Sequence, residues 1–141
     1  MSDIQEDLRQ YLIADASVLA LVSTRIYPDV LPQGQSNDSI VLETISSNTD
    51  GTIGGTIVSV GTRISVRCYS STKKQASVIA KTIRIDAGLE QLANTTMNGR
   101  WIQHVECEDA ITGQEELPID GGSYSRYVAV QDYRVVHDDD T

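Results

Sequence analysis

The sequence lacks phenylalanine and contains only two cysteines and three prolines. Without phenylalanine, the core must be built from Val, Ile, Leu and some of the six tyrosines. No apolar run approaches the roughly 20 residues that span a bilayer, so we expect no membrane partner. The polar, acidic start MSDIQEDLRQ also lacks the basic and apolar regions of a signal peptide. We therefore expect a protein that is made, and at first kept, inside a cell.

Basic residues are scarce. Eleven Lys and Arg face twenty Asp and Glu, which gives a net charge of −9. This balance argues against binding nucleic acid through its phosphates, which requires clustered basic side chains. The acids gather in Glu106–Asp120, where no base occurs, and in Asp138–Asp140. We interpret the first region as a solvated face and residues 138–141 as an acidic tail on a single domain of residues 1–137.

The two cysteines, Cys68 and Cys107, do not have the CxxC spacing of a zinc or redox site. Cys68 lies on the apolar side of a predicted strand and is expected to be a small buried side chain. Cys107 could lie on an adjacent strand, which would allow a disulfide in principle. We expect none, because disulfides are rare in the cytosol.

The stretch Val58–Tyr69 is the clearest structural signal, because apolar and polar residues alternate along it with a period of two. One face is expected to be buried and the other polar, and a shift of one residue would bring Arg63 and Arg67 into the core. We expect these two arginines to form ion pairs, either across strands with Glu43 or the acidic strand, or across a subunit contact. The residues expected on the buried face are Val58, Val60, Thr62, Ile64, Val66 and Cys68.

Helical and strand signals flank this stretch. Asp3 with Glu6 forms a capping signal before an amphipathic helix, and Asp15 can cap a second, short helix. Two prolines make Arg25–Gly34 an extended, irregular segment, in which Arg25 could bind backbone carbonyls. The remaining expected elements are a strand at Ile40–Ser46, a Gly-rich connection at Asn48–Thr56, a helix at Thr72–Leu89, a turn at Asn98–Gly99, a strand at Trp101–Ile111, a loop at Thr112–Ser123 and a strand at Tyr124–His137.

This order predicts an α+β fold, with a mostly antiparallel four-stranded sheet packed by helices in the order α-α-β-β-α-β-β. The last strand carries apolar residues on both faces, as a central strand or a strand at a subunit contact would. The Gly-rich connection leads into a strand and not into a helix N-terminus, so we do not interpret it as a phosphate-binding loop.

Two groups of residues could in principle carry chemistry. His104, Glu106 and Glu108 share one face of a predicted strand, while Cys107 points away from them. We interpret them as part of a polar outer face, because no nucleophile or second histidine has a matching position. His137 with Asp138–Asp140 could bind a cation, but a terminal acidic run lacks the shaped loop of a hard-cation site. We therefore predict no catalytic, cofactor-binding or metal-binding residues.

Four segments in the same order resemble the tail completion, or tail terminator, proteins of long-tailed bacteriophages. Leu12–Gly34 resembles the opening of that family, with its Arg-Ile-Tyr-Pro and Leu-Pro-Gln-Gly motifs. Ser39–Ser46 matches a family strand, with Leu42 where Tyr is usual, and Arg63–Ser70 resembles the central strand. Val130–His137 resembles the closing strand, in which an aromatic residue often replaces Val136. Glu106–Asp120 and the Asp tail lie outside this pattern.

The resemblance implies a structural protein without enzymatic activity, which forms a hexameric ring. Such a ring lies on the last ring of the tail tube, ends the polymerisation of the tube and presents a surface to the head connector or adaptor. It also implies a location in the virion, at the head-proximal end of the tail, after assembly in the host cytoplasm. DNA would pass through the lumen without specific binding, and an excess of carboxylates there would keep the polyanion from adhering.

We expect Asn48–Thr56 and Thr112–Ser123 to reach neighbouring subunits or the tube. The individual contact candidates are Asp50, Gly51, Thr52, Ile53, Gly54, Gly55, Arg63, Arg67, Glu115 and Glu116. Three other functions remain open: a different head–tail connector or adaptor, a subunit of the tail tube itself, or a small-ligand-binding α+β domain. A tube subunit would form long stacks unaided, and a ligand-binding domain would need a pocket around His104.

Overall fold

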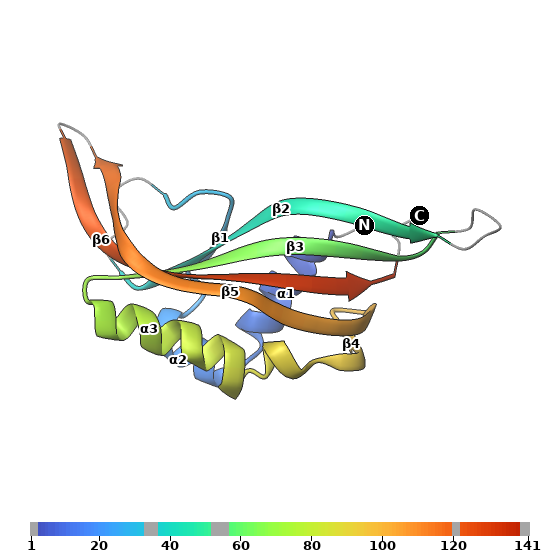
Figure 1. Ribbon diagram of the computed structural model, residues 1–141. Coiled ribbons are helices and arrows are strands. Elements are labelled where there is room, and N and C mark those ends of the chain that lie inside the picture. The colour runs from blue at the N-terminus through green and yellow to red at the C-terminus, as the bar shows by residue number, and fades with distance from the viewer. Residues whose placement is uncertain (1–2, 33–36, 52–56, 120–121, 139–141) are drawn as a thin grey trace.

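The part of the chain that the structure describes forms a single curled sheet of six strands, and its helices cover one face of this sheet (Figure 1). The computed structural model describes residues 3–32, 37–51, 57–119 and 122–138. The strand order across the sheet is β1-β2-β3-β6-β5-β4. The mixed α/β class is confirmed, but the prediction of four strands was wrong because the short strands at the two edges were missed.

The two N-terminal helices begin where the sequence predicted. Helix α1 spans Ile4–Ile13, and the side chain of its N-cap Asp3 accepts a hydrogen bond from the Glu6 N–H at 2.8 Å. Helix α2 spans Ala16–Val22, and its N-cap Asp15 accepts from the N–H groups of Ser17 and Val18. These carboxylates satisfy N–H groups that would otherwise lack a partner in the first turn of each helix.

Edge strand β1, Ile26–Pro28, forms where an irregular segment was expected. It pairs in parallel with β2, Ser39–Gly51. Pro28 is tolerated because it ends a strand at the sheet edge, where its missing N–H breaks no central hydrogen bond. The Nε of Arg25 donates to the carbonyl of Asp38 at 2.8 Å, which confirms the predicted role of Arg25 in anchoring this segment.

The predicted long helix is divided in the structure. Helix α3 spans Lys73–Lys81, a π-helical turn η1 spans Thr82–Asp86, and a 3-10 turn η2 spans Leu89–Gln91. The hydroxyl of Thr82 bonds back to the Val78 carbonyl at 2.8 Å, where the α-helical pattern ends. Gly88 adopts a left-handed conformation, with φ of 70°, and separates η1 from η2.

The second missed strand is β4, Ala93–Met97, which pairs with β5 across the Asn98–Gly99 turn. Strand β5 extends over Arg100–Ile119 and β6 over Gly122–His137, so most of the predicted loop at Thr112–Ser123 is a paired hairpin. Similarly, β2 continues to Gly51 and β3 spans Ile57–Ser70, so the Gly-rich connection is shorter than expected. Residues 52–56 lie outside the described part of the chain.

Strand β3 confirms the predicted alternation on one face and corrects it on the other. Ile64, Val66 and Cys68 are fully buried against the helices, in the main core. The opposite face is not simply polar, because Tyr69 is 1% exposed and packs with Val41 and Val128 in a second cluster. Tyr27 and Leu31 pack against this second cluster. The side chain of Val58 lies outside the described residues.

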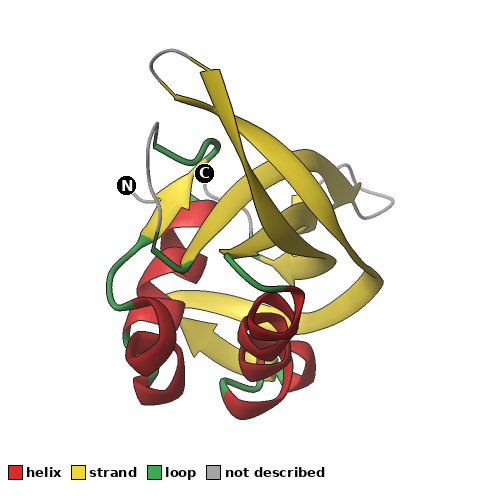
Figure 2. Cartoon of the chain, turned by 90° about the vertical axis from the view of Figure 1, so that its left-hand side faces the viewer, coloured by secondary structure: helices red, strands yellow, loops and turns green. Residues whose placement is uncertain are grey.

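Strand β5 does not keep the regular alternation that the sequence suggested. Register shifts occur between Ile102 and His104 and again between Cys107 and Asp109. The first shift lets both Ile102 and Val105 face the core, although they would lie on opposite faces of a regular strand. Strand β6 runs between β3 and β5, the central position that was one of the two alternatives expected for it. Figure 2 shows the helices gathered on one side of the curled sheet.

None of the described helices is both long enough and apolar enough to cross a membrane.

Candidate assembly surfaces

The sheet extends past its helical layer at two ends (Figure 1). At one end, β5 and β6 pair only with each other from Glu115 to Ile119 and from Gly122 to Arg126, because β3 pairing stops at Tyr127. We call this the β5–β6 arm. At the other end, Asp50 and Gly51 pair with Ser59 and Ile57 beyond the last β6 partner. We call residues 50–51 with 57–59 the β2–β3 arm.

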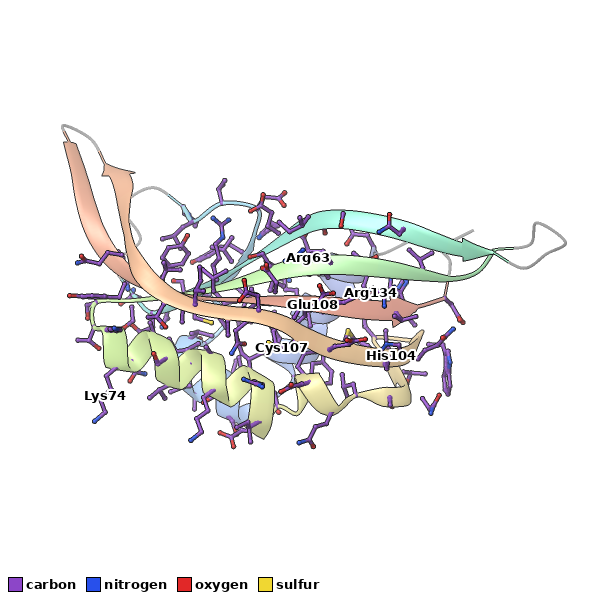
Figure 3. The ribbon with its side chains drawn as sticks, in the orientation of Figure 1. Arg63, Lys74, His104, Cys107, Glu108 and Arg134 are labelled. Atoms are coloured by element: carbon purple, nitrogen blue, oxygen red, sulfur yellow. The ribbon has the colours of Figure 1, made fainter. Side chains whose placement is uncertain are left out.

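The contact candidate Arg63 lies on the sheet face opposite the helices (Figure 3), and Arg67 shares that face because it lies four residues further along β3. Both arginines are paired within the chain. Arg67 contacts the Glu43 carboxylate at 3.1 Å and donates to the Asp29 carbonyl at 2.8 Å. Arg63 donates to Asp132 of β6 at 2.8 Å, whereas the sequence had suggested Glu43 or the acidic strand. The cross-strand ion pairing predicted for both arginines is therefore confirmed.

A polar groove of about 240 Å³ lies beside Arg63, and Arg134 forms one wall of it. The Arg134 guanidinium lies directly over Gly61, so closely that a Cβ at this glycine would be 2.8 Å from the Nη2 atom. Ser46, Asn48 and Glu108 complete the lining. Arg134 was not predicted, since only the pairing of β3 with β6 brings it over a glycine.

His104 contacts Glu106 at the protein surface. Its Nε2 lies 3.1 Å from a Glu106 carboxylate oxygen, and both side chains are well exposed. Cys107 lies on the opposite, core-facing side of β5, and burial raises the pKa of its thiol. Strand β6 separates Cys107 from Cys68, because Tyr133 pairs with Cys107 on one side and Ile64 on the other. The two cysteines are thus not on adjacent strands, and both are free.

His137 is turned into the fold. It is 2% exposed, and its Nε2 lies 2.7 Å from the Thr62 hydroxyl. Its Nδ1 lies 2.7 Å from the Asp138 carbonyl, so the neutral ring donates there and accepts from Thr62. Burial lowers the pKa of His137. Within residues 3–32, 37–51, 57–119 and 122–138, no three His, Cys, Asp or Glu side chains could hold a metal ion, and Asp139 and Asp140 lie outside these ranges.

A buried ion pair, which the sequence did not predict, joins helix α1 to the β4–β5 turn. Asp7 is 1% exposed, and one of its carboxylate oxygens accepts from the Nε of Arg100. The other accepts from the Asn98 side chain at 2.9 Å. Asp7 follows the capping signal of α1 as an ordinary first-turn acid, so nothing local marks it as buried.

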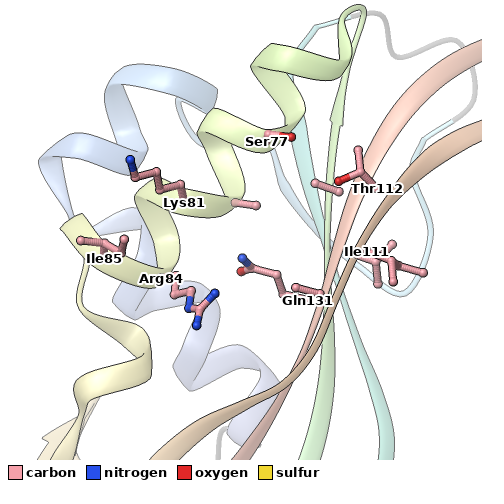
Figure 4. A pocket seen from close by; sticks show the side chains of 11 residues that line it. Ser77, Lys81, Arg84, Ile85, Ile111, Thr112 and Gln131 are labelled. Atoms are coloured by element: carbon pink, nitrogen blue, oxygen red, sulfur yellow. The ribbon is translucent and has the colours of Figure 1, made fainter.

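A second groove separates α3 and η1 from strands β5 and β6, with a volume of about 330 Å³ (Figure 4). Lys81, Arg84 and Ile85 line its helical side, and Ile111 and Thr112 line its strand side. The π-helical turn places Arg84 and Ile85 at the mouth of this groove. We call it the α3 groove.

The fold and its surfaces define a small mixed α/β protein in which long strands extend past a helix-backed core. Comparison with known proteins gives the family. Residues 6–98 match the family described as tail completion protein gp17. The chain belongs to this family, which confirms the resemblance seen in its motifs. It is therefore a structural protein of a phage virion, from the tail or the head–tail region.

A solved structure has the same fold along nearly its whole length. The solved chain comes from the virion of a native gene transfer agent particle, and it aligns with the present chain with a TM-score of 0.62 and 16% identity. The alignment covers 95% of the present chain and 94% of the other. At this identity the likeness establishes the fold alone. No curated protein sequence matches the chain.

The predicted contact residues fall into three groups, according to how much of each residue the structure describes. Arg63 and Arg67 are described in full. Asp50, Gly51, Glu115 and Glu116 are described through their backbone pairing. Thr52, Ile53, Gly54 and Gly55 lie outside the described residues.

Proposed function

We propose that the protein forms a closed, hexameric ring on the end of the phage tail tube. The ring ends the polymerisation of the tube and offers a surface to the connector or adaptor of the head. Membership of the tail completion family supports this function. The supporting structural feature is the pair of arms, which leave the helix-backed core at opposite ends (Figure 1).

Two paired arms at opposite ends suit a ring for a physical reason. A two-stranded ribbon is marginally stable in water by itself, so it gains most from packing on another surface. A ring requires contacts between two different patches of each subunit, with a rotation that closes. An arm at one end and a complementary surface elsewhere provide such a pair of patches. In this proposal Asp50–Gly55, Glu115 and Glu116 contact neighbouring subunits or the tube.

The charge of the chain supports the proposed passage of DNA. Each chain carries a net charge of −9, so a ring of such chains repels a polyanion instead of retaining it. Carboxylates that face the lumen would allow DNA to pass without specific binding. Six lumen-facing Lys or Arg positions in a structure of the ring would contradict this part of the proposal.

The test is the mass of the purified protein in solution, together with negative-stain images of the protein alone and mixed with tail tubes. We expect rings of hexamer mass, or a monomer that caps tubes and stops their growth. Long filaments from the protein alone would instead identify a tube subunit. A monomer that binds the head connector but not the tube would identify an adaptor.

The β2–β3 arm is tested by deletion of residues 50–55. We expect the deletion to abolish ring assembly, because the shortened hairpin can no longer reach a neighbour. A matched variant replaces the same residues with a Gly-Ser segment of equal length, which separates the need for reach from the need for side chains. Unchanged ring assembly after the deletion would rule out this role of the arm.

A further inference from the structure

The three lysines of the chain are unpaired cations in an otherwise acidic protein. Lys73, Lys74 and Lys81 all lie on α3, which contains no acid, and all three are exposed. Among the described residues, none forms an ion pair with these ammonium groups. Arginines such as Arg63 and Arg67, in contrast, already bond to carboxylates of the same chain. Helix α3 therefore presents positive charge that is free to oppose the carboxylates of a partner.

Two of these lysines alternate with apolar side chains along one side of the helix. Lys74, Val78, Lys81 and Ile85 follow at intervals of four, three and four residues, which places them in one row. Val78 and Ile85 are 38% and 53% exposed, which is high for side chains of this kind. In Figure 4, Lys81 and Ile85 lie on the same side of the helical ribbon. We call these four residues the α3 stripe.

Strand β5 carries the opposite charge on the other face of the sheet. Asp109 pairs with Asp132, and Ile111 pairs with Val130. Cross-strand partners lie on the same face of a sheet, and Val130 packs against the second cluster, opposite the helices. The side chains of Asp109 and Ile111 therefore point away from α3, and Ile111 is 62% exposed.

Glu108 lies on this face as well, because it lines the polar groove beside Arg63 and Arg134 (Figure 3). The register shift between Cys107 and Asp109 allows two successive acids to share one face. Both acids are exposed, and the nearby Arg63 already donates to Asp132. We call Glu108, Asp109 and Ile111 the β5 patch. It combines negative charge with exposed apolar surface, as the α3 stripe combines positive charge with apolar surface.

The two surfaces cannot meet within one copy, because the sheet lies between them (Figure 1). Two copies of the α3 stripe would repel each other, since each presents lysines and no acid. A two-fold contact through this stripe is therefore unfavourable. A contact between the stripe of one copy and the patch of another joins two different surfaces, as a head-to-tail arrangement requires.

We propose that the α3 stripe of one copy packs on the β5 patch of the next copy, with Lys81 facing Asp109 and Ile85 packing on Ile111. The spacings agree. Four helical residues separate Lys81 from Ile85 by about 6 Å along the helix axis. Two strand residues separate Asp109 from Ile111 by about 7 Å. This inference rests on the proposed ring and names a contact that repeats around it.

Charge reversal tests the contact. We expect K81E and D109K, each alone, to associate about tenfold more weakly than wild type, because each places like charges opposite each other. Mixing the two variants restores assembly. In alternating rings the glutamate of one variant meets the lysine of the other, and the next contact has the wild-type pair. Sedimentation of each variant and of the mixture, alone and with tail tubes, gives the readout.

The apolar half of the contact is tested by Ile111→Ser. We expect association to weaken about tenfold, because the side chain no longer packs on Ile85. The midpoint of urea unfolding should stay close to that of wild type, since Ile111 is largely exposed in the single copy. Unchanged association of this variant would overturn the packing that we propose.

A matched control makes the same charge change on the same helix outside the stripe. Lys73 precedes Lys74 by one residue and so lies on another side of α3, and K73E is expected to alter association by about twofold or less. Equal loss in K73E and K81E would overturn the proposal, because it would assign the effect to the overall charge of α3.

The remaining outcomes separate this contact from the ring itself. Wild-type-like rings from both K81E and D109K would overturn the contact and leave the ring in place. Weakened assembly of both variants without rescue in the mixture would also overturn it, since the two residues would then act at separate contacts. Wild-type protein that is monomeric both alone and with tail tubes would overturn the ring and the contact together.

Discussion

The helix-backed centre of the sheet and its outer stretches use the same strands in opposite ways. In the centre, β3 and β6 are buried by helices on one face and by the Tyr69 cluster on part of the other. The outer stretches, Thr44–Asn48 of β2 and Glu108–Gln114 of β5, are exposed at every residue. These stretches lead into the two arms.

This difference indicates how one continuous strand can stabilise the core and also carry an arm that we propose for assembly. Hydrophobic burial fixes the register in the centre, and that register then dictates how residues pair far outside it. The arms therefore need little stabilisation of their own to hold a defined direction. Substitutions in the centre should lower the free energy of unfolding, whereas substitutions in the outer stretches should change assembly alone.

The largest effect is expected from Asp7→Ala, which breaks the buried ion pair. Without the carboxylate, Arg100 keeps its charge in a site where its side chain is only 9% exposed. Removing one partner of a buried pair costs about 3–5 kcal/mol. Urea unfolding of the variant should show a loss of this size.

Asp15→Ala is the matched control, since it removes a carboxylate that only caps α2 from the exposed side. Loss of an N-cap costs about 1 kcal/mol. If Asp7→Ala were no more destabilising than Asp15→Ala, α1 would not be held to the β4–β5 turn in the way that we describe.

A matched pair of isoleucines compares the two regions directly. Ile64 is fully buried in the main core, whereas Ile45, in the outer stretch of β2, is 52% exposed. We expect Ile64→Ala to cost about 2–5 kcal/mol through lost burial and the cavity left behind. Ile45→Ala should stay within about 0.5 kcal/mol of wild type. Thermal or urea unfolding measures both.

Ring assembly by the same two variants completes this comparison. Ile64→Ala should still assemble at temperatures where it remains folded. Equal losses of stability in the two variants would mean that the outer stretch of β2 belongs to the core, and that the division we draw is misplaced.

The parts of the fold that were predictable have local causes. Asp3 and Asp15 mark helix starts because their side chains bond to N–H groups two or three residues away. The alternation around Ile64 predicts a strand because a buried sheet face requires it. Strand β1 was missed because its residues pair only with β2, and Pro28 makes it look irregular.

The candidate surfaces were only partly predictable, because they depend on pairing between distant segments. Cross-strand ion pairing was predicted for Arg63 and Arg67, but Asp132 as the partner of Arg63 depends on the register of β3 with β6. The α3 groove lies where β5, beyond its register shift between Cys107 and Asp109, passes α3 and η1, and neither the shift nor this neighbourhood is visible in the sequence. The three lysines of α3 could be placed on a helix from the sequence, but the strand residues that lie across the groove from this helix could not be predicted.

His137 lies at the end of the helix-backed centre of the sheet, since it pairs with Val60 at the last contact between β3 and β6. Its protonation therefore reports how far the buried centre extends. Burial lowers its folded-state pKa below the ordinary value of about 6.5, so the fold favours the neutral ring. As the pH falls below about 6.5, the unfolded chain binds a proton that the folded chain resists. The free energy of unfolding therefore decreases with falling pH until the lowered pKa is reached.

His137→Gln removes this titration while the side chain keeps one donor and one acceptor. We expect the variant to lose less stability than wild type between pH 7.5 and pH 5.5, measured by urea unfolding at both values. Other groups also face the imidazole ring of His137, namely Thr62, Asp138, Arg100 and Asp7. They are present in both proteins, so the difference between the two pH slopes isolates His137. Identical slopes would mean that His137 is hydrated in the folded state, and that the buried centre stops short of Val60.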